Sequence, residues 1–87
     1  MATRVDVESI ADMIANKILG VEPDDLLRWL PDGRVRVQMG KIFPDRSGYR
    51  QTVQGRRRRL RESLIERLNP MGWVHLGSST FGRTEPQ

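Results

Sequence analysis

A chain of 87 residues without cysteine can build only one small hydrophobic core. At this length roughly 60% of the surface of the unfolded chain becomes buried, which leaves little apolar volume to enclose an active site. The absence of thiols excludes a disulfide framework and a thiolate metal site, and the single His75 cannot form a histidine cluster. We therefore expect one domain at residues 1–83, a frayed tail at residues 84–87, and no enzyme, catalytic residue, metal or cofactor.

Two helices are predicted in the first third of the chain. Within residues 6–19, apolar side chains recur at spacings of three and four. Asp6 suits the N-cap of this helix, and Gly20 suits a left-handed C-terminal cap. A second helix is predicted at residues 23–30, because a proline suits its first position and the next proline ends the apolar pattern.

A turn and two kinds of strand pattern follow. Residues 31–33, Pro-Asp-Gly, are a typical turn sequence. Residues 34–39 then alternate polar with apolar side chains, which predicts a half-buried strand with one basic face. Near the C-terminus, residues 73–83 are predicted to form a hairpin around a Gly-Ser-Ser turn, with Trp73 and Phe81 covering the core.

The segment between these strands is ambiguous. Residues 41–53 fit a hairpin around Pro-Asp-Arg-Ser-Gly, but Ser47 also fits the N-cap of a helix. We favour a helix that is firm only from Gly55. Residues 56–69 carry a clear apolar stripe, and the Pro-Met-Gly sequence of residues 70–72 ends it.

These elements predict a small α+β domain. Its expected order is two N-terminal helices, a strand or hairpin, a long basic helix, and a C-terminal β-hairpin beside the first strand. No apolar run approaches the roughly 20 residues that span a bilayer, and no signal-peptide pattern begins the chain. An intracellular, cytoplasmic protein without membrane contact is therefore expected.

Charge is strongly segregated along the chain. The 28 residues from Arg34 to Arg61 contain nine Arg and one Lys against the single acid Asp45, a net charge of +9, whereas the whole chain carries +4. Residues 1–32 carry seven acids and three bases, a net charge of −4. Because a field of one sign attracts polyanions, nucleic acid is the first candidate partner.

Four consecutive arginines, residues 56–59, are the most concentrated basic feature. We expect them in the first turn of the long helix, where free backbone N–H groups and guanidinium groups would converge on a phosphate or a carboxylate. The alternative is a solvated face that Glu62 and Glu66 partly neutralise at spacings of three and four residues. The one-sided charge favours contact with a polyanion or an acidic partner.

Residues 10–30 resemble a helix-turn-helix unit. The packing and turn positions that carry this resemblance are Ile14, Leu19, Gly20, Val21, Leu26 and Trp29. The family usually places a small residue where this chain has Asn16. Glu22, Asp24 and Asp25 would meet DNA at the start of the recognition helix, which electrostatics opposes. The resemblance therefore implies that this acidic unit is a scaffold or an interface, and that the later helix reads DNA.

Residues 52–83 resemble a winged-helix domain. Thr52 and Val53 precede an Arg-rich helix with Leu60 on its apolar face, and Gly72 leads into a hairpin in the place of a wing. The resemblance implies a DNA-binding fold.

The residues expected to contact nucleic acid combine donors to phosphates with donors to base edges. Phosphates would be held by Arg56, Arg57, Arg58, Arg59 and Arg61, with Arg34, Arg36 and Lys41 extending the track. The candidates for base edges are Arg50, Gln51 and Gln54. Trp29 and Trp73 are expected as core or rim anchors, which leaves one Tyr and two Phe to stack unpaired bases. A duplex is therefore expected rather than a single strand, and RNA stays open beside DNA.

The predicted function is therefore non-enzymatic binding of duplex DNA, by a small transcription regulator or by an accessory protein of a phage or mobile element. The competing prediction is a protein-binding module or inhibitor whose basic face docks an acidic or nucleic-acid-binding surface of a partner protein. The apolar side chains of the two N-terminal segments also predict a homodimer.

Overall fold

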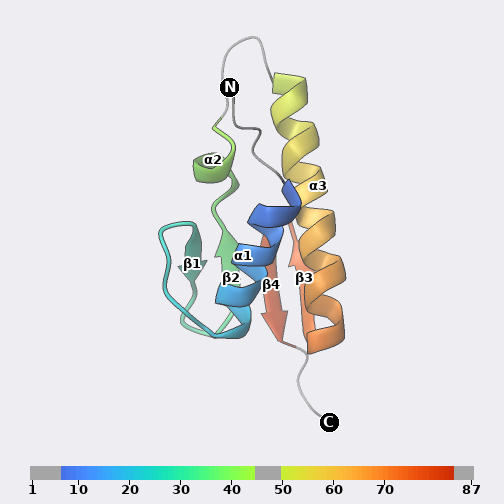
Figure 1. The fold of residues 1–87 in the computed structure, drawn as a ribbon. Coiled ribbons are helices and arrows are strands. Elements are labelled where there is room, and N and C mark those ends of the chain that lie inside the picture. The colour runs from blue at the N-terminus through green and yellow to red at the C-terminus, as the bar shows by residue number, and fades with distance from the viewer. Residues whose placement is uncertain (1–6, 45–49, 84–87) are drawn as a thin grey trace.

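The computed structural model describes residues 7–44 and 50–83, with the side chains of Arg50 and Gln51 left aside. Two helices cover one face of a four-stranded antiparallel sheet (Figure 1). The elements in chain order are α1 (Val7–Leu19), β1 (Leu27–Trp29), β2 (Val35–Val37), α2 (Met39–Ile42), α3 (Arg50–Leu68), the 3-10 helix η1 (Asn69–Met71), β3 (Trp73–Gly77) and β4 (Thr80–Arg83). The predicted α+β class, with a long basic helix and a terminal hairpin, is confirmed.

The expectations for Asp6 as an N-cap, Ser47 as a cap and residues 84–87 as a tail lie outside the described residues. Among those described, no helix is both long and apolar enough to cross a membrane.

One hydrophobic cluster joins the helices to the sheet. The stripe predicted on the first helix places Ile14 and Ile18 in it, and α3 contributes Leu60, Leu64 and Leu68 at helical spacings. All five side chains are at most 1% exposed, and each contributes about 1.5–3 kcal/mol through removal of apolar surface from water.

The predicted second helix at residues 23–30 is wrong, because the chain makes a turn and then enters β1. Asp24 Oδ1 accepts a hydrogen bond from Leu26 N at 2.8 Å, and Asp24 O accepts one from Leu27 N at 3.0 Å. The carboxylate therefore closes a turn instead of capping a helix. The Leu26 N–H donor also lowers the pKa of the Asp24 carboxyl group.

Pairing with β2 decides the conformation of this segment. Leu27 lies opposite Val37 and Trp29 lies opposite Val35, so two apolar residues of β1 reach the core side of the sheet. A short apolar run between two prolines fits either a strand or a helix, and an isolated helix of this length is marginal. Without the second helix, residues 10–30 do not form a helix-turn-helix unit. The homodimer stays a prediction, although Leu27 is now accounted for in the core of the monomer.

The cap of α1 falls one residue later than predicted. Val21, and not Gly20, is the residue with a left-handed backbone, at a φ of 51°. Val21 N donates to Ile18 O at 3.0 Å and Glu22 N donates to Lys17 O at 2.9 Å, which are the two hydrogen bonds of a Schellman cap.

The ambiguous segment contains two helices. Short α2 follows β2, and α3 begins at Arg50, so the hairpin alternative for residues 41–53 is wrong. The early start of α3 also corrects the placement of residues 56–59, which lie in its second and third turns and not in its first. Their guanidinium groups therefore do not combine with the free N–H groups of a helix start.

The sheet order β1-β2-β4-β3 places the terminal hairpin beside β2, as predicted. Val35 and Val37 are buried and Arg36 is exposed, which confirms the alternation predicted for this strand. Trp73 and Phe81 are buried as predicted, and Trp73 packs edge to face on Trp29 with ring centroids 6.1 Å apart. Along the chain a helix, two strands, a short helix, a long helix, a 3-10 helix and a hairpin follow one another. The resemblance to a winged-helix domain stays a prediction.

Candidate nucleic-acid interface

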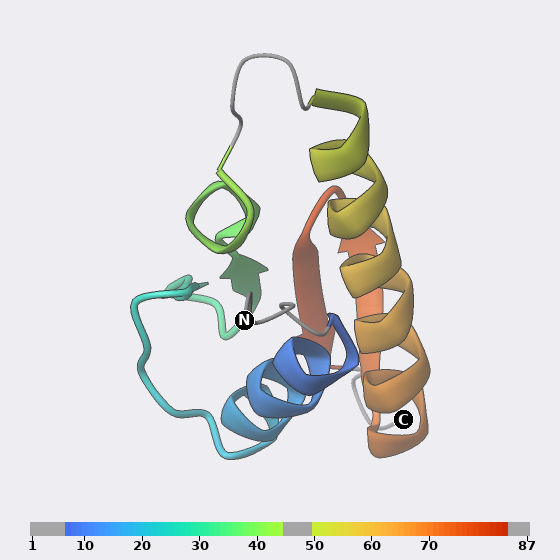
Figure 2. The ribbon, with the colours of Figure 1, turned by 45° about the horizontal axis from the view of Figure 1, so that its top comes forward.

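The N-terminal half of α3 stands clear of α1, whereas its C-terminal half packs beside it (Figure 2). At about 1.5 Å per residue, a helix of 19 residues is roughly 28 Å long. Its buried leucines face the core, so the opposite arc faces solvent. Gln54, Gly55, Arg56, Arg58, Arg59 and Glu62 are exposed on that arc, and Arg61 is half-buried at its edge.

Arg57 is the member of the arginine run that turns inward. Its Nε and Nη2 atoms donate hydrogen bonds to Phe43 O at 3.1 and 2.5 Å. Phe43 and Val53 are buried in the same cluster, so Arg57 holds the segment after α2 against the N-terminal half of α3. The structure therefore gives Arg57 a structural contact that the sequence did not predict.

Four further arginines of α3 have no side-chain partner among the residues that the structure describes. Across residues 7–44 and 50–83, no hydrogen bond or ion pair involves the side chains of Arg56, Arg58, Arg59 and Arg61. The ion pairs with Glu62 and Glu66 that would have made this a neutralised face are not formed. We call Gln54, Arg56, Arg58, Arg59 and Arg61 the α3 basic face.

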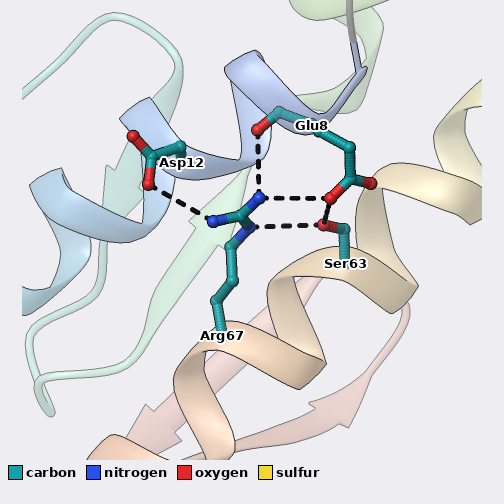
Figure 3. A network of polar contacts seen from close by, with 4 residues as sticks. All are labelled: Glu8, Asp12, Ser63 and Arg67. Atoms are coloured by element: carbon teal, nitrogen blue, oxygen red, sulfur yellow. Dashed lines mark hydrogen bonds and ion pairs between the residues drawn. The ribbon is translucent and has the colours of Figure 1, made fainter.

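Arg67 of the same helix, in contrast, is engaged. Arg67, in the last turn of α3, donates from Nη2 to Glu8 Oε1 at 3.1 Å and from Nη1 to Asp12 Oδ1 at 3.3 Å (Figure 3). Ser63 Oγ donates to the same Glu8 oxygen at 3.0 Å and accepts from Arg67 Nε at 3.3 Å. This network ties α1 to the C-terminal half of α3.

Two members of the predicted extension of the track have contacts of their own. Arg34 Nε donates to Asp32 Oδ2 at 2.6 Å, and Lys41 Nζ donates to Asp25 O at 3.2 Å. Arg36 lies opposite Arg28 on the sheet face away from the helices. Because α3 contacts β3, at the other edge of the sheet, β4 and β3 separate Arg36 from the α3 basic face.

Two shallow hollows mark the surface of α3, and both contain Gly55. The larger, of about 470 Å³, is lined by Thr52, Gly55, Arg56, Arg58, Arg59 and Glu62. The smaller, of about 310 Å³, is lined by Gln54, Gly55, Arg58 and Arg61. The charged and amide walls suit an anion or a polar edge better than an apolar ligand.

Of the residues predicted to read base edges, Gln54 lies on the α3 basic face, while the side chains of Arg50 and Gln51 lie outside the description. Gly55 and Glu62 were missed as members of the candidate site. Their helical spacing from Arg58 and Arg59 would have placed them there once the start of α3 was known.

His75 contacts the turn of the terminal hairpin. Its Nε2 lies 2.6 Å from Ser78 O, and because a carbonyl only accepts, Nε2 carries the proton. Within the described part of the chain, no group of three or more acidic, His or Cys side chains is arranged to hold a metal ion.

Comparison of the chain with protein-family models, with curated proteins and with solved structures found no match.

Proposed function

We propose that the protein is a non-enzymatic, intracellular DNA-binding protein that places the α3 basic face against a duplex. The observation that supports this function best is the group of four guanidinium groups on one arc of α3. Within the described chain none of them meets a counter-ion, although Lys17, Arg34 and Arg67 all do.

The electrostatic energy of this arginine cluster favours a bound polyanion. Arg56 and Arg59 are three residues apart on the helix, as are Arg58 and Arg61, so like charges lie side by side and repel one another. Such a cluster becomes favourable when a polyanion arrives, because phosphates accept paired guanidinium hydrogen bonds and release condensed counter-ions. Because the arginine cluster becomes favourable only when a partner binds, it supports a binding surface rather than a role in stabilising the fold.

The dimensions favour duplex DNA among nucleic acids. A helix with its side chains is about 10–12 Å across, and the major groove of B-form DNA is about 12 Å wide. The deep, narrow major groove of duplex RNA does not admit a helix. Residues 52–68 contain no aromatic side chain, so this face offers no platform on which unpaired bases would stack.

The roles then follow from position. Arg58 and Arg59, at the centre of the exposed arc, contact phosphates on either side, and Arg56 and Arg61 add contacts at its margins. Gln54 points an amide, which can pair with adenine, from the same face. A small regulator or an accessory protein of a phage or mobile element would use such a surface.

The decisive experiment is a salt titration with an unrelated 20-base-pair duplex, followed by fluorescence anisotropy. Binding should weaken steeply from low to high salt, with a dissociation constant in the micromolar range or weaker at physiological salt. The double variant R58Q/R59Q should bind less tightly and should lower the log–log salt slope by about 1.8, because each lost phosphate contact removes about 0.9.

A charge-matched control is available on the sheet. R28Q/R36Q also removes two positive charges that make no described ion pair, but from the face away from α3. It should leave the slope nearly unchanged. Equal losses of affinity in the two double variants would show that the duplex responds to net charge and not to α3. If the parent protein does not bind the duplex even at low salt, the partner is instead an acidic protein.

A further inference from the structure

Gly55 lowers the stability of the helix that contains it. It lies in the second turn of α3 and is exposed, and glycine is among the least favourable residues inside a helix because it loses most backbone freedom on folding. The fold gives no reason for it. A Cβ atom built at Gly55 would meet nothing within 4 Å beyond its chain neighbours and the adjacent backbone of α3, and the φ angle of Gly55 is not positive.

The position of Gly55 on the surface is more informative. It is shared by the two hollows, and Arg58, three residues later, lines both of them. Arg59, four residues later, lines the larger hollow on the other flank. Residues three and four apart on a helix are neighbours on its surface. Because Gly55 has no side chain, the helix backbone is exposed between the side chains of Arg58 and Arg59.

We infer that Gly55 is the point of closest approach between α3 and the duplex, and that it determines how deeply the helix sits. This inference rests on the proposed function. With no side chain at residue 55, the rim of the groove lies against the helix backbone, and Arg58 and Arg59 reach phosphates at charge-assisted distances of about 2.7–2.9 Å. A methyl group there would hold the helix outward and lengthen those bonds, which weaken steeply with distance and angle.

The inference separates stability from binding. Gly55→Ala should raise the melting temperature by about 3–6 °C, as expected when an exposed helix glycine becomes alanine in a domain of this size. The same substitution should weaken duplex binding by about tenfold. Gly55→Leu, which also favours a helix, should weaken binding further because its side chain is larger.

Asn16→Ala is the matched control. Asn16 is exposed within α1, away from the α3 basic face, and alanine is also the better helix former there. This variant should melt at a higher temperature than the parent protein and bind the duplex equally well. Any loss of affinity that comes from stabilising a helix in general would then appear in both variants.

The experiment measures melting temperature and affinity for the 20-base-pair duplex in the full chain for all variants. Parent-like affinity of both Gly55 variants would overturn the inference, as would a Gly55→Ala protein that does not gain stability. R58Q/R59Q distinguishes the two levels of the proposal. If that variant loses binding while the Gly55 variants keep it, the proposed function stands and the role of Gly55 falls; if the parent protein does not bind, the proposed function itself has failed.

Discussion

The two halves of α3 use the same residue type in opposite ways. In the C-terminal half, Arg67 meets two carboxylates and a hydroxyl group, and together they fix α1 against α3. In the N-terminal half, Arg58 and Arg59 meet none within the described residues. A count of arginines along the chain cannot distinguish these cases, but the presence of a counter-ion can.

The difference follows from what each half packs against. Leu60, Leu64 and Leu68 bury the C-terminal half between α1 and the sheet, so side chains at its margins fall within reach of acids on α1. The N-terminal half is held chiefly through Val53 and through Arg57 on Phe43 O, and its outer arc meets solvent. One half therefore stabilises the fold, while the other remains open to a partner.

The largest expected effect on stability comes from a substitution in the packed C-terminal half of α3. Leu64 is fully buried, and Leu64→Ala should lower the free energy of unfolding by about 2–5 kcal/mol, through lost burial and the cavity that remains. Urea denaturation followed by circular dichroism measures this change. Arg58→Ala is the control from the open half and should change stability by less than about 0.5 kcal/mol. Similar losses in both variants would contradict the division of α3.

The next effect compares two arginines directly. Arg67→Ala removes the donor that Glu8 and Asp12 share, and should cost about 1–2 kcal/mol, discounted because the site is partly exposed. Arg59→Ala removes an equal charge from the same helix and should leave stability within about 0.5 kcal/mol. Thermal melts of both variants, repeated at high salt, test the contrast. If the Arg67→Ala variant is as stable as the parent protein, the network of Figure 3 adds nothing to the stability of the fold.

Sequence patterns predicted the elements whose signal is local. The helical stripe of α1, the leucines of α3, the alternation around Arg36 and the terminal hairpin all rest on spacings within one element. Each pattern has a period that solvent and core impose directly, and the structure confirms these elements.

The failures have a different physical origin. Asp24 offers its carboxylate equally to a helix start and to a turn, and only the pairing of β1 with β2 decides between them. The partners of Arg67 lie 55 and 59 residues away in sequence, so no local spacing could separate it from the open arginines. Predicting the candidate site required the start of α3, because only a helix that begins before Gln54 places Gln54 and Gly55 beside Arg58 and Arg59.

A smaller effect concerns the link between the open half and the core. Arg57→Ala removes both hydrogen bonds to Phe43 O and should cost about 1 kcal/mol, concentrated in the N-terminal half of α3. Hydrogen exchange of backbone amides should therefore accelerate around residues 53–57 more than around residues 64–68. Uniform acceleration along α3 would mean that its two halves open together and are not distinct in stability.

The smallest effect tests where the binding half ends. Glu62 is exposed, lines the larger hollow beside Arg58 and Arg59, and would repel phosphates held there. Glu62→Gln should tighten binding of the unrelated duplex by about threefold at low salt, an advantage that screening removes as salt rises. Glu66→Gln, one turn further toward the packed half, removes the same charge outside the hollow and should have less effect. If Glu62→Gln instead weakens binding, the carboxylate itself contacts DNA, as when it accepts from a cytosine amino group, and the interface extends further toward the packed half of α3.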